Sequence, residues 1–398
     1  MKDNVALRVC SDYCTGCGLC ASVKGVSFSE DERRFLQPKL EAEQLPFLKT
    51  VCPAMGNALN HCVDGTIWGR YERCALGWAK DEALRHAASS GGVLSALCCY
   101  LIESGRVDGV IQTMRDPSDP RRTVTVVSNS AEAVRACCGS RYTASSPLMH
   151  IRDLIEPGKK YAYVGKPCDV SALRMWKNEG KEAWTDQILW LFSFFCAGQP
   201  SLRANDRLLS ALGIDDVAQC ADLSYRGNGW PGFATAKKTD GTEQKMDYER
   251  SWMTILGRDV RRSCRFCADG VGEQADISCG DAWFLTAEGK PDFTERPGRN
   301  VIFARTDPGA KLLQEAVDAG FVAVEPYDPE KDGLKKSQPY HNNRKASLRS
   351  LRLAMHLCGR PFPDYSTSRL KQFEKGFPLK QRVLRCLGTV KRVWSKAI

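Results

Sequence analysis

The sequence contains no apolar run long enough to cross a bilayer. The longest one, ILWLFSFFC over residues 188–196, is too short to span a membrane and is typical of a buried strand. The first ten residues, MKDNVALRVC, lack the apolar core of an export signal. No internal repeat and no low-complexity tract is present. These absences predict a cytoplasmic chain, and its length of 398 residues with 43% hydrophobic and 26% charged residues predicts a soluble protein of two or three domains.

Cysteine is abundant, with nineteen cysteines among 398 residues. In a reducing cytoplasm, clustered cysteines bind metal more often than they form disulfides. Four of the cysteines lie in helical or apolar contexts and are expected to be ordinary core residues. These are Cys98, Cys99, Cys137 and Cys138.

The first candidate metal site is the C-x2-C-x2-C run DYCTGCGLC, which contains Cys14, Cys17 and Cys20. This spacing matches the bacterial ferredoxin pattern, in which three such cysteines bind one iron–sulfur cluster. No fourth cysteine follows within residues 21–25. Cys52 is the preferred fourth ligand because it precedes Pro53, and Cys62 and Cys10 are the alternatives.

A second candidate site combines four cysteines that lie far apart in the sequence. Cys168 and Cys196 follow apolar strands, and Cys264 and Cys267 form a C-x2-C pair in a basic loop. The carboxyl ends of strands in an open α/β sheet share one edge, so these thiols are expected to converge there. Four thiolates suit one 4Fe–4S cluster. Tetrahedral zinc is the alternative, although zinc sites usually use two C-x2-C pairs.

Strand and helix patterns alternate along the middle of the chain, which predicts an α/β fold. A helix is expected over residues 93–104, ended by Gly105. A strand, a loop with Pro167-Cys168 and a helix capped by Asp169 follow, with antiparallel pieces near residues 233–248. We expect four segments: a small ferredoxin-like iron–sulfur domain (1–72), the two parts of an α/β body (73–155 and 156–334), and a basic helical tail (335–398).

The tail concentrates the positive charge of the protein. Residues 335–398 contain sixteen Lys and Arg against Asp364 and Glu374, a net charge of +14 in a chain whose total is +10. An apolar stripe with a basic opposite face suits a membrane interface, an acidic partner or packing on the protein's own body. The stripe consists of Leu379, Val383, Leu384, Leu387, Val390, Val393 and Trp394.

Six motifs in order resemble the beta-subunit family of coenzyme F420 hydrogenases and dehydrogenases, over residues 10–320. They are CTGCGLC, SSGGVLSAL, GSRYTASSPLM, VGKPCDVSALR, FFCAGQPS and CRFCADGVGEQADISCGDAW. The resemblance implies an iron–sulfur flavoprotein oxidoreductase that holds FAD and two 4Fe–4S clusters. It would pass electrons between a hydride carrier or organic substrate and one-electron carriers. Hydroxymethyl chlorophyll reductase is a relative of this family.

The resemblance also implies roles for particular residues. Two segments are expected to approach the flavin: Ser89, Ser90, Gly91 and Gly92, and Gly139, Ser140, Arg141, Tyr142 and Thr143. Small residues before the helix at Val93 would leave backbone N–H groups free for a pyrophosphate. Lys166 and Asp281 would supply protons or charge. The expected partner is a ferredoxin-type protein, a complex subunit or an F420-like carrier, and no nucleic acid is expected. A non-catalytic electron-transfer or zinc-bound structural subunit is the alternative.

Overall fold

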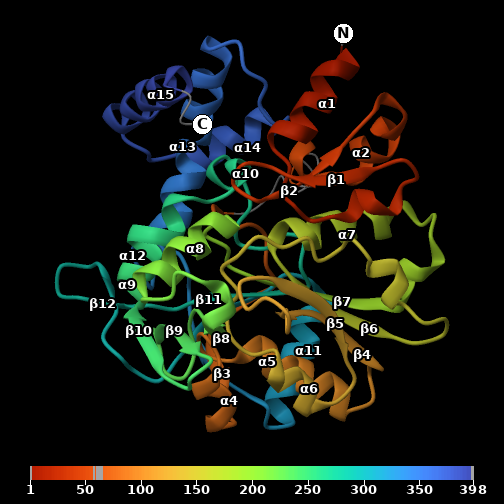
Figure 1. Ribbon diagram of the computed structural model, residues 1–398, viewed down its shortest axis with the longest axis vertical. Helices are drawn as coiled ribbons and strands as arrows, with labels where there is room; N and C mark the ends of the chain where they lie inside the picture. The colour runs from red at the N-terminus through yellow and green to blue at the C-terminus, as the bar shows by residue number, and fades with distance from the viewer. Residues whose placement is uncertain (1, 57–58, 60–65, 396–398) are drawn as a thin grey trace.

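The computed structural model describes residues 2–56, 59 and 66–395, and it confirms the α/β class (Figure 1). Its centre is an eight-stranded mixed sheet. The strands follow the order β15 (Val322–Pro326), β3 (Arg73–Ala79), β14 (Asn300–Ala304), β11 (Ile277–Asp281), β7 (Ile188–Phe194), β6 (Tyr161–Gly165), β4 (Gly109–Arg115) and β5 (Thr123–Ser128). Strands β4, β6, β7 and β11 pair in parallel, and the remaining pairs are antiparallel.

The central strands β6 and β14 are buried on both faces of the sheet, which explains why they are nearly continuous apolar runs. Neighbouring residues of β6 belong to different cores: Ala162 packs with helices α5 (Val93–Glu103) and α11 (Asp307–Asp318), and Tyr163 packs with α7 (Pro167–Glu179). Helices α5 and α7 therefore lie on opposite faces of the sheet. Three shorter helices, α4 (Glu82–Ala87), α6 (Ala131–Ala136) and α10 (Arg262–Arg265), lie in the connections.

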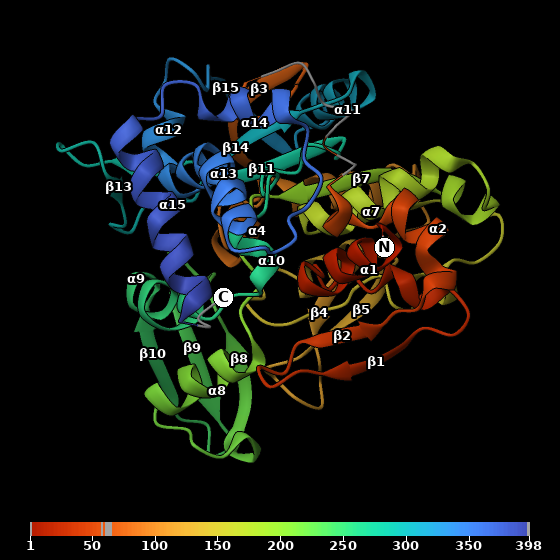
Figure 2. The ribbon, with the colours of Figure 1, turned by 90° about the horizontal axis from the view of Figure 1, so that it is seen from above.

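The N-terminal segment lies above one end of the sheet in Figure 1 and beside α7 in Figure 2. It contains helices α1 (Lys2–Asp12) and α2 (Leu45–Val51) and the hairpin of β1 (Ser27–Glu30) and β2 (Leu36–Lys39). Helix α2 packs on α7, where Phe47 meets Trp176 edge to face with 5.0 Å between ring centroids. The predicted alternative ligand Cys62 lies outside the described residues.

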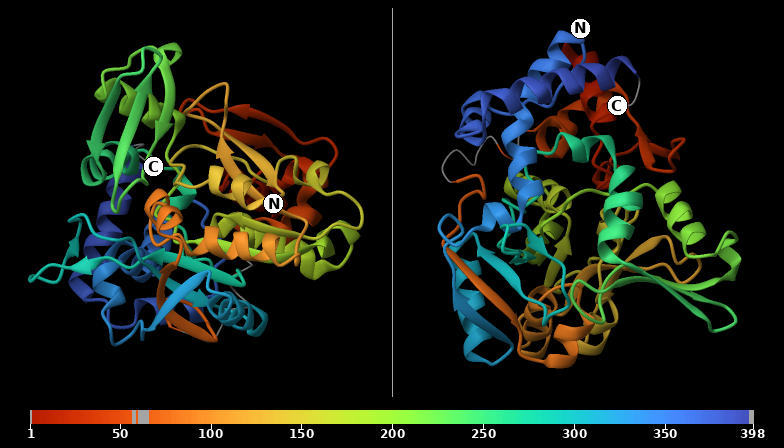
Figure 3. Two further views of the ribbon diagram at one scale, coloured as in Figure 1. Left: turned by 90° about the horizontal axis from the view of Figure 1, so that it is seen from below. Right: turned by 90° about the vertical axis from the view of Figure 1, so that its left-hand side faces the viewer.

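A separate three-stranded antiparallel sheet projects from the body (Figure 3). Its strands are β8 (Cys220–Ser224), β9 (Phe233–Lys238) and β10 (Glu243–Asp247), flanked by helices α8 (Leu202–Ala211) and α9 (Tyr248–Arg250). The predicted antiparallel pieces near residues 233–248 are confirmed. A short pair, β12 (Phe284–Leu285) and β13 (Pro291–Asp292), completes the strands of the described chain.

The tail forms helices α12 (Leu334–Ser337), α13 (Pro339–Leu357), α14 (Thr367–Glu374) and α15 (Leu379–Trp394). Helix α13 reaches into the protein: Leu348 and Met355 belong to a buried cluster with Val9 of α1 and Phe266. The tail is therefore part of the packed molecule. Among the described residues, no helix combines the length and apolar character needed to cross a membrane.

One boundary differs from the sequence expectation. Helix α7 begins at Pro167, so Cys168 lies in its first turn and not in a loop before the helix. Proline suits the first helical position because it has no N–H to leave unbonded. Asp169 is the third helical residue, and its carboxylate accepts a hydrogen bond from the Lys166 N–H at 3.0 Å. Asp169 thus caps the helix from inside its first turn.

Candidate functional site

The structure brings the four distant cysteines to one cavity at the carboxyl edge of the parallel strands. Cys168 follows β6, Cys196 follows β7, and Cys264 and Cys267 come from α10 and the residues after it. All four line a cavity of ≈ 750 Å³, including its opening to solvent, which we call the first cavity. Its remaining walls come from the N-terminal segment, at Tyr13 and Ala54, and from the tail, at Arg344 and Tyr365.

Two cations border the first cavity, and their surroundings differ. The Nζ atom of Lys166 lies 2.9 Å from an oxygen of the fully buried Asp169 carboxylate, and it donates to Ser145 Oγ at 3.0 Å. Burial, the largest single influence, lowers the pKa of Lys166, but the charge and hydrogen bond of Asp169 together with the nearby thiols of Cys168 and Cys196 raise it, and the net shift is upward. Lys166 is therefore a charge-paired cation at the cavity wall.

Arg344 has no comparable partner. Its side chain is buried, and its Nη atoms donate to the carbonyl oxygen of Cys196 at 3.3 Å and contact His341 Nδ1 at 3.2 Å. Its Nε atom is buried without a hydrogen-bond acceptor, and within the described chain no carboxylate forms an ion pair with it. A guanidinium is always charged, and burying an unpaired charge is costly. The cavity therefore carries a positive charge that the described protein groups leave uncompensated.

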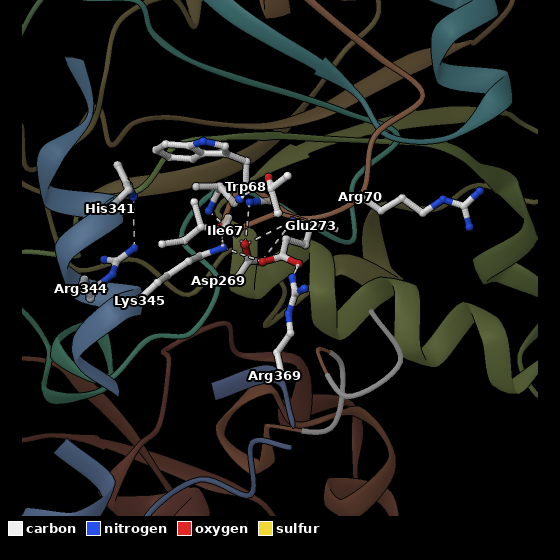
Figure 4. A network of polar contacts seen from close by, with 12 residues as sticks. Ile67, Trp68, Arg70, Asp269, Glu273, His341, Arg344, Lys345 and Arg369 are labelled. Carbon is white, nitrogen blue, oxygen red and sulfur yellow. Dashed lines mark hydrogen bonds and ion pairs between the residues drawn. The ribbon is translucent and has the colours of Figure 1, made fainter. Parts of the chain in front are cut away.

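Close to Arg344, an ion network holds the tail against residues 268–273, the loop after Cys267 that we call the cavity loop because it lines the first cavity (Figure 4). Glu273 is fully buried between Lys345 of α13, at 2.6 Å, and Arg369 of α14. The Lys345 Nζ atom also donates to the carbonyl oxygen of Ile67 at 2.9 Å. Asp269 accepts hydrogen bonds from the N–H groups of residues 271–273, which shapes the loop after Cys267. This network positions α13, and with it Arg344.

The cysteines of the N-terminal run line a second cavity of ≈ 470 Å³. Cys14, Cys17, Cys20 and Cys52 all contribute to its wall, and Thr15 lines both cavities. The two cavities are therefore neighbours. Cys10 also lines the second cavity, and it hydrogen-bonds Cys52 closely enough to raise the pKa of the Cys52 thiol. Cys52 and Cys10 are thus both available as the fourth ligand.

The loop around this second cavity needs two of its glycines. Gly16 and Gly18 have φ angles of +72° and +87°, a region that side chains rarely adopt. A Cβ atom on Gly16 would lie 2.7 Å from the guanidinium of Arg261, and one on Gly18 would lie 2.9 Å from the backbone nitrogen of Met149. The Gly16 N–H donates to Cys14 Sγ at 3.4 Å. These glycines let the loop curl so that its cysteines share one cavity.

The cysteine thiols are spread around the walls of the two cavities and do not converge on a single point. In the part of the chain that the structure describes, no group of three or more His, Cys, Asp or Glu side chains lies close enough to hold a single metal ion. Burial raises the pKa of Cys17 and of Cys196 to about 12. Binding of a metal centre there would therefore release protons, because the ligands bind as thiolates.

The two segments expected to approach a flavin lie side by side. The Ser140 N–H donates to Ser89 Oγ at 2.5 Å, and a Cβ atom on Gly139 would lie 3.5 Å from the carbonyl oxygen of Arg226. The Nη1 atom of Arg226 donates to the hydroxyl of Tyr142 at 3.3 Å. Residues 89, 139–142 and 226 therefore gather at one place.

Two residues of the first segment, Ser90 and Gly91, and the Val93 N–H that follows it serve the fold. Gly91 packs against strand β14, since a Cβ atom there would lie 2.7 Å from Asn300 Oδ1. The Val93 N–H donates to the same Asn300 oxygen at 3.3 Å, and Ser90 Oγ donates to the carbonyl oxygen of Arg299. The Asn300 side chain thus caps the Val93 N–H, which is not free for a pyrophosphate, and flavin binding by the rest of this segment stays a prediction. Arg141 also serves packing: it donates to the backbone oxygens of Leu223 and Pro120.

The structure does not bring Lys166 and Asp281 together as partners. Asp281 ends β11 and binds Arg226 in a two-pronged ion pair, at 2.9 and 3.1 Å. The guanidinium of Arg226 lies over the rings of Tyr248 and Trp283, at 4.6 and 5.2 Å from their centroids. Lys166 lines the first cavity, and Ser145 links it to the end of the second flavin segment.

Sequence reasoning missed Arg226 and Arg344. Arg226 stands in the glycine-rich stretch RGNGWPG, whose turns place it beside the predicted flavin segments. Arg344 lies in the basic tail, where no local pattern separates it from fifteen other cations.

Comparison with known proteins identifies the family. The family model of the coenzyme F420 hydrogenase/dehydrogenase beta subunit matches in two parts, its N-terminal part over residues 74–152 and its C-terminal part over residues 158–330. Together these matches cover more than half of the chain, and both end before the tail begins.

Curated relatives agree with this match. The coenzyme F420 hydrogenase subunit beta of Methanococcus voltae is 26% identical over 301 residues, covering 74% of this chain and 99% of that protein. The same subunit of Methanothermobacter thermautotrophicus is 22% identical over 303 residues, covering 75% and 99%.

A solved structure shares the fold. A chain of the F420-reducing NiFe hydrogenase complex from Methanosarcina barkeri superposes with a TM-score of 0.59 at 18% identity, covering 76% of this chain and 99% of that chain. The order of motifs, the α/β body and these matches agree, and the chain belongs to the coenzyme F420 hydrogenase/dehydrogenase beta-subunit family.

Proposed function

We propose that this protein is an iron–sulfur flavoprotein oxidoreductase that passes electrons between a hydride carrier and one-electron carriers. One 4Fe–4S cluster would be held by Cys168, Cys196, Cys264 and Cys267, and a second by Cys14, Cys17, Cys20 and Cys52. FAD would lie beside the segments at Ser89 and Ser140. The observation that carries the proposal is the pair of neighbouring thiol-lined cavities, one of which holds an unpaired cation.

The first cavity fits a cluster better than a zinc ion. Tetrahedral zinc draws four sulfur atoms to about 2.3 Å from one point. A 4Fe–4S cluster binds each thiolate through a different iron, so it needs thiols spread around a space. The cavity has this form. A cluster with four thiolates is an anion, and the unpaired guanidinium of Arg344 would compensate part of its charge.

The second cavity supports the cluster of Cys14, Cys17, Cys20 and Cys52, which we call the outer cluster, on the same grounds. It presents the C-x2-C-x2-C run together with Cys52. We propose Cys52 as the fourth ligand, and Cys10 as its hydrogen-bond neighbour. Because Thr15 lines both cavities, the two centres would be close enough to exchange electrons directly.

A flavin would connect hydride transfer with one-electron transfer, because it accepts a hydride as two electrons and releases them one at a time. The protein's own groups would bind and orient it. Ser89 and Ser140 hold the two segments together, and Arg226 with Asp281 offers a buried, paired cation beside Tyr142. Lys166 would hold positive charge at the first cavity, where the second segment ends. Residues 139–145 would thus connect the flavin region with the cluster of the first cavity.

The hydride carrier is proposed from the relatives. Several of them are named as F420 hydrogenase or F420-dependent formate dehydrogenase subunits, which favours an F420-like carrier here. Because these relatives are named as subunits, we propose a redox partner protein for this chain as well. A subunit that transfers electrons without a substrate of its own is the second candidate. Turnover of a reduced deazaflavin by the isolated chain would separate the two.

The ligand assignment is tested by two matched substitutions. Cys264→Ser removes a thiol of the first cavity, whereas Cys138→Ser changes a half-buried cysteine that lines neither cavity. We expect Cys264→Ser to lose about half of the iron and Cys138→Ser to lose none. Iron, sulfide and flavin are measured on anaerobically purified protein. Equal iron in both variants would reject the assignment.

A further inference from the structure

Helix α15 has two apolar faces, of which only one packs on the protein. Thr389 and Val393 are buried, and Val393 joins the core cluster beneath α13. On the same side, Arg382 pairs with Glu374 at 3.1 Å and donates to the carbonyl oxygen of Phe377. These contacts anchor the helix to the body. Packing on the body, one of the three alternatives for the predicted stripe, is therefore observed for Val393.

The second face consists of large side chains that remain exposed. Leu379 and Trp394, at the two ends of the helix, are 73% and 78% exposed. The exposed stripe, as we call it, comprises Leu379, Val383, Leu384, Leu387 and Trp394. Four of these residues follow one another at intervals of four, four and seven residues, so they form a line along the helix of about 22 Å. Figures 1 and 2 show α15 on the outside of the molecule.

An exposed apolar stripe of this kind indicates a surface that another molecule covers. Single exposed leucines are common on proteins, but a contiguous apolar line on an amphipathic helix is typical of an interaction site. Neither half of the family match reaches this helix, since both end by residue 330. The stripe is thus a feature of the tail of this chain.

The charge around the stripe indicates what covers it. Residues 375–398 contain seven Lys and Arg and no Asp or Glu. On a helical projection, Lys380 and Lys391 lie on the side away from the packing face, between the line of four residues and Leu384, and both are exposed. Lysines in this position favour an anionic surface.

Lipid fits these lysines better than protein does. Lysine is depleted in protein–protein interfaces, because burying its ammonium is costly and its side chain is flexible. At a bilayer, lysine extends its ammonium to the phosphates while its stem and its apolar neighbours enter the interface. Tryptophan is enriched at this depth. We propose that α15 docks the protein on an anionic lipid bilayer, with the exposed stripe in the headgroup region and its axis parallel to the surface.

The test is sedimentation of the full-length protein with vesicles of phosphatidylcholine, alone or mixed with phosphatidylglycerol. Val383→Glu/Leu387→Glu places two glutamates on the stripe. Gln381→Glu/Ser395→Glu adds the same two charges at exposed positions off the stripe. We expect the mixed vesicles to bind the intact protein at least tenfold better than phosphatidylcholine does. The stripe variant should lose at least tenfold in binding, and the control variant about twofold.

Three results would overturn the proposal. They are absence of binding to the mixed vesicles, an equal loss in both variants, and a dimer in lipid-free solution that only the stripe variant dissociates. The last would show that a second copy covers the stripe. Thermal melting checks folding, and all four changed side chains are exposed, so both variants should melt with the intact protein. The proposal is independent of the cofactors, whose content should be unchanged in both variants.

Discussion

Arg344 donates hydrogen bonds to the carbonyl oxygen of Cys196 at 3.3 Å, and so joins the tail helix α13 to the wall of the first cavity. The two residues are separated by 148 positions in the sequence. A Cβ atom on Gly270 would coincide with the Arg344 guanidinium, so the cavity loop leaves room for this side chain. The tail therefore contributes to the candidate site and is not only an appendage.

Substitution of Arg344 should have an effect that depends on the metal centre. In iron-loaded protein, Arg344→Met would remove a cation that compensates the proposed anionic cluster. In iron-free protein, the same change would remove an unpaired buried charge. We expect the loss in free energy of unfolding to be about 1–3 kcal/mol larger for the loaded form. Arg349→Met, on the same helix, breaks an ion pair with Glu374 that lines neither cavity and should cost the same in both forms. An equal cost for Arg344→Met in both forms would contradict the role given to it.

Glu273 should make the protein sensitive to acid. Burial raises the pKa of Glu273, but Lys345 and Arg369 lower it by more, so its pKa lies below the ordinary value. A carboxyl group of this kind stabilises the fold above its unfolded pKa of about 4.3, and the stabilisation is lost as pH falls through the folded value. We expect Glu273→Gln to cost about 3–5 kcal/mol at pH 7, because two cations would lose their partner. Stability of the variant should also fall less steeply below pH 4.3, as measured by urea unfolding. The exposed Glu325→Gln should change neither quantity, and the same result for Glu273→Gln would reject a structural role for the network.

Gly91 should prove to be a packing residue. Gly91→Ala places a Cβ atom 2.7 to 2.8 Å from Asn300 and from the carbonyl oxygen of Gly77, so we expect a loss of about 1–3 kcal/mol in stability with or without flavin. Gly388→Ala in α15 meets only the far end of Arg392, at 3.7 Å, and should be neutral or stabilise by up to about 1 kcal/mol. If Gly91→Ala instead left stability unchanged and abolished flavin binding, the residue would belong to the flavin site.

The fourth ligand of the outer cluster can be settled by a pair of variants. Cys52→Ser should remove about four irons per chain and Cys10→Ser none, because the proposal assigns only Cys52 as a ligand. Electron paramagnetic resonance of the reduced protein should lose one cluster signal in the first variant alone. The opposite pattern would assign Cys10, which lines the same cavity.

The parts of the fold that were predictable rest on local pattern. The helix at Val93 ends at Glu103, beside the predicted stop at Gly105, and the strand before Cys196 follows its apolar run. The meeting of Cys168 with Cys196 was predictable as well, because parallel strands order their carboxyl ends along one edge. Both inferences need only neighbouring residues and a rule of topology.

The rest depends on contacts between distant segments. The Val93 N–H is capped by Asn300, which is 207 residues away, and no feature near Val93 announces this partner. Asp281 pairs with Arg226 across 55 residues, so its partner could not be predicted from the strand that carries it. Helix α15 shows the same limit, because its apolar period identifies a stripe but not which part of it packs on α13.

The most direct test of the central claim is the cofactor content of full-length protein purified without oxygen. The account predicts about eight iron, about eight acid-labile sulfide and about one FAD per chain, with visible absorption of both cofactors. About four irons would contradict one of the two clusters. Zinc in place of iron, with no bound flavin, would contradict the account as a whole.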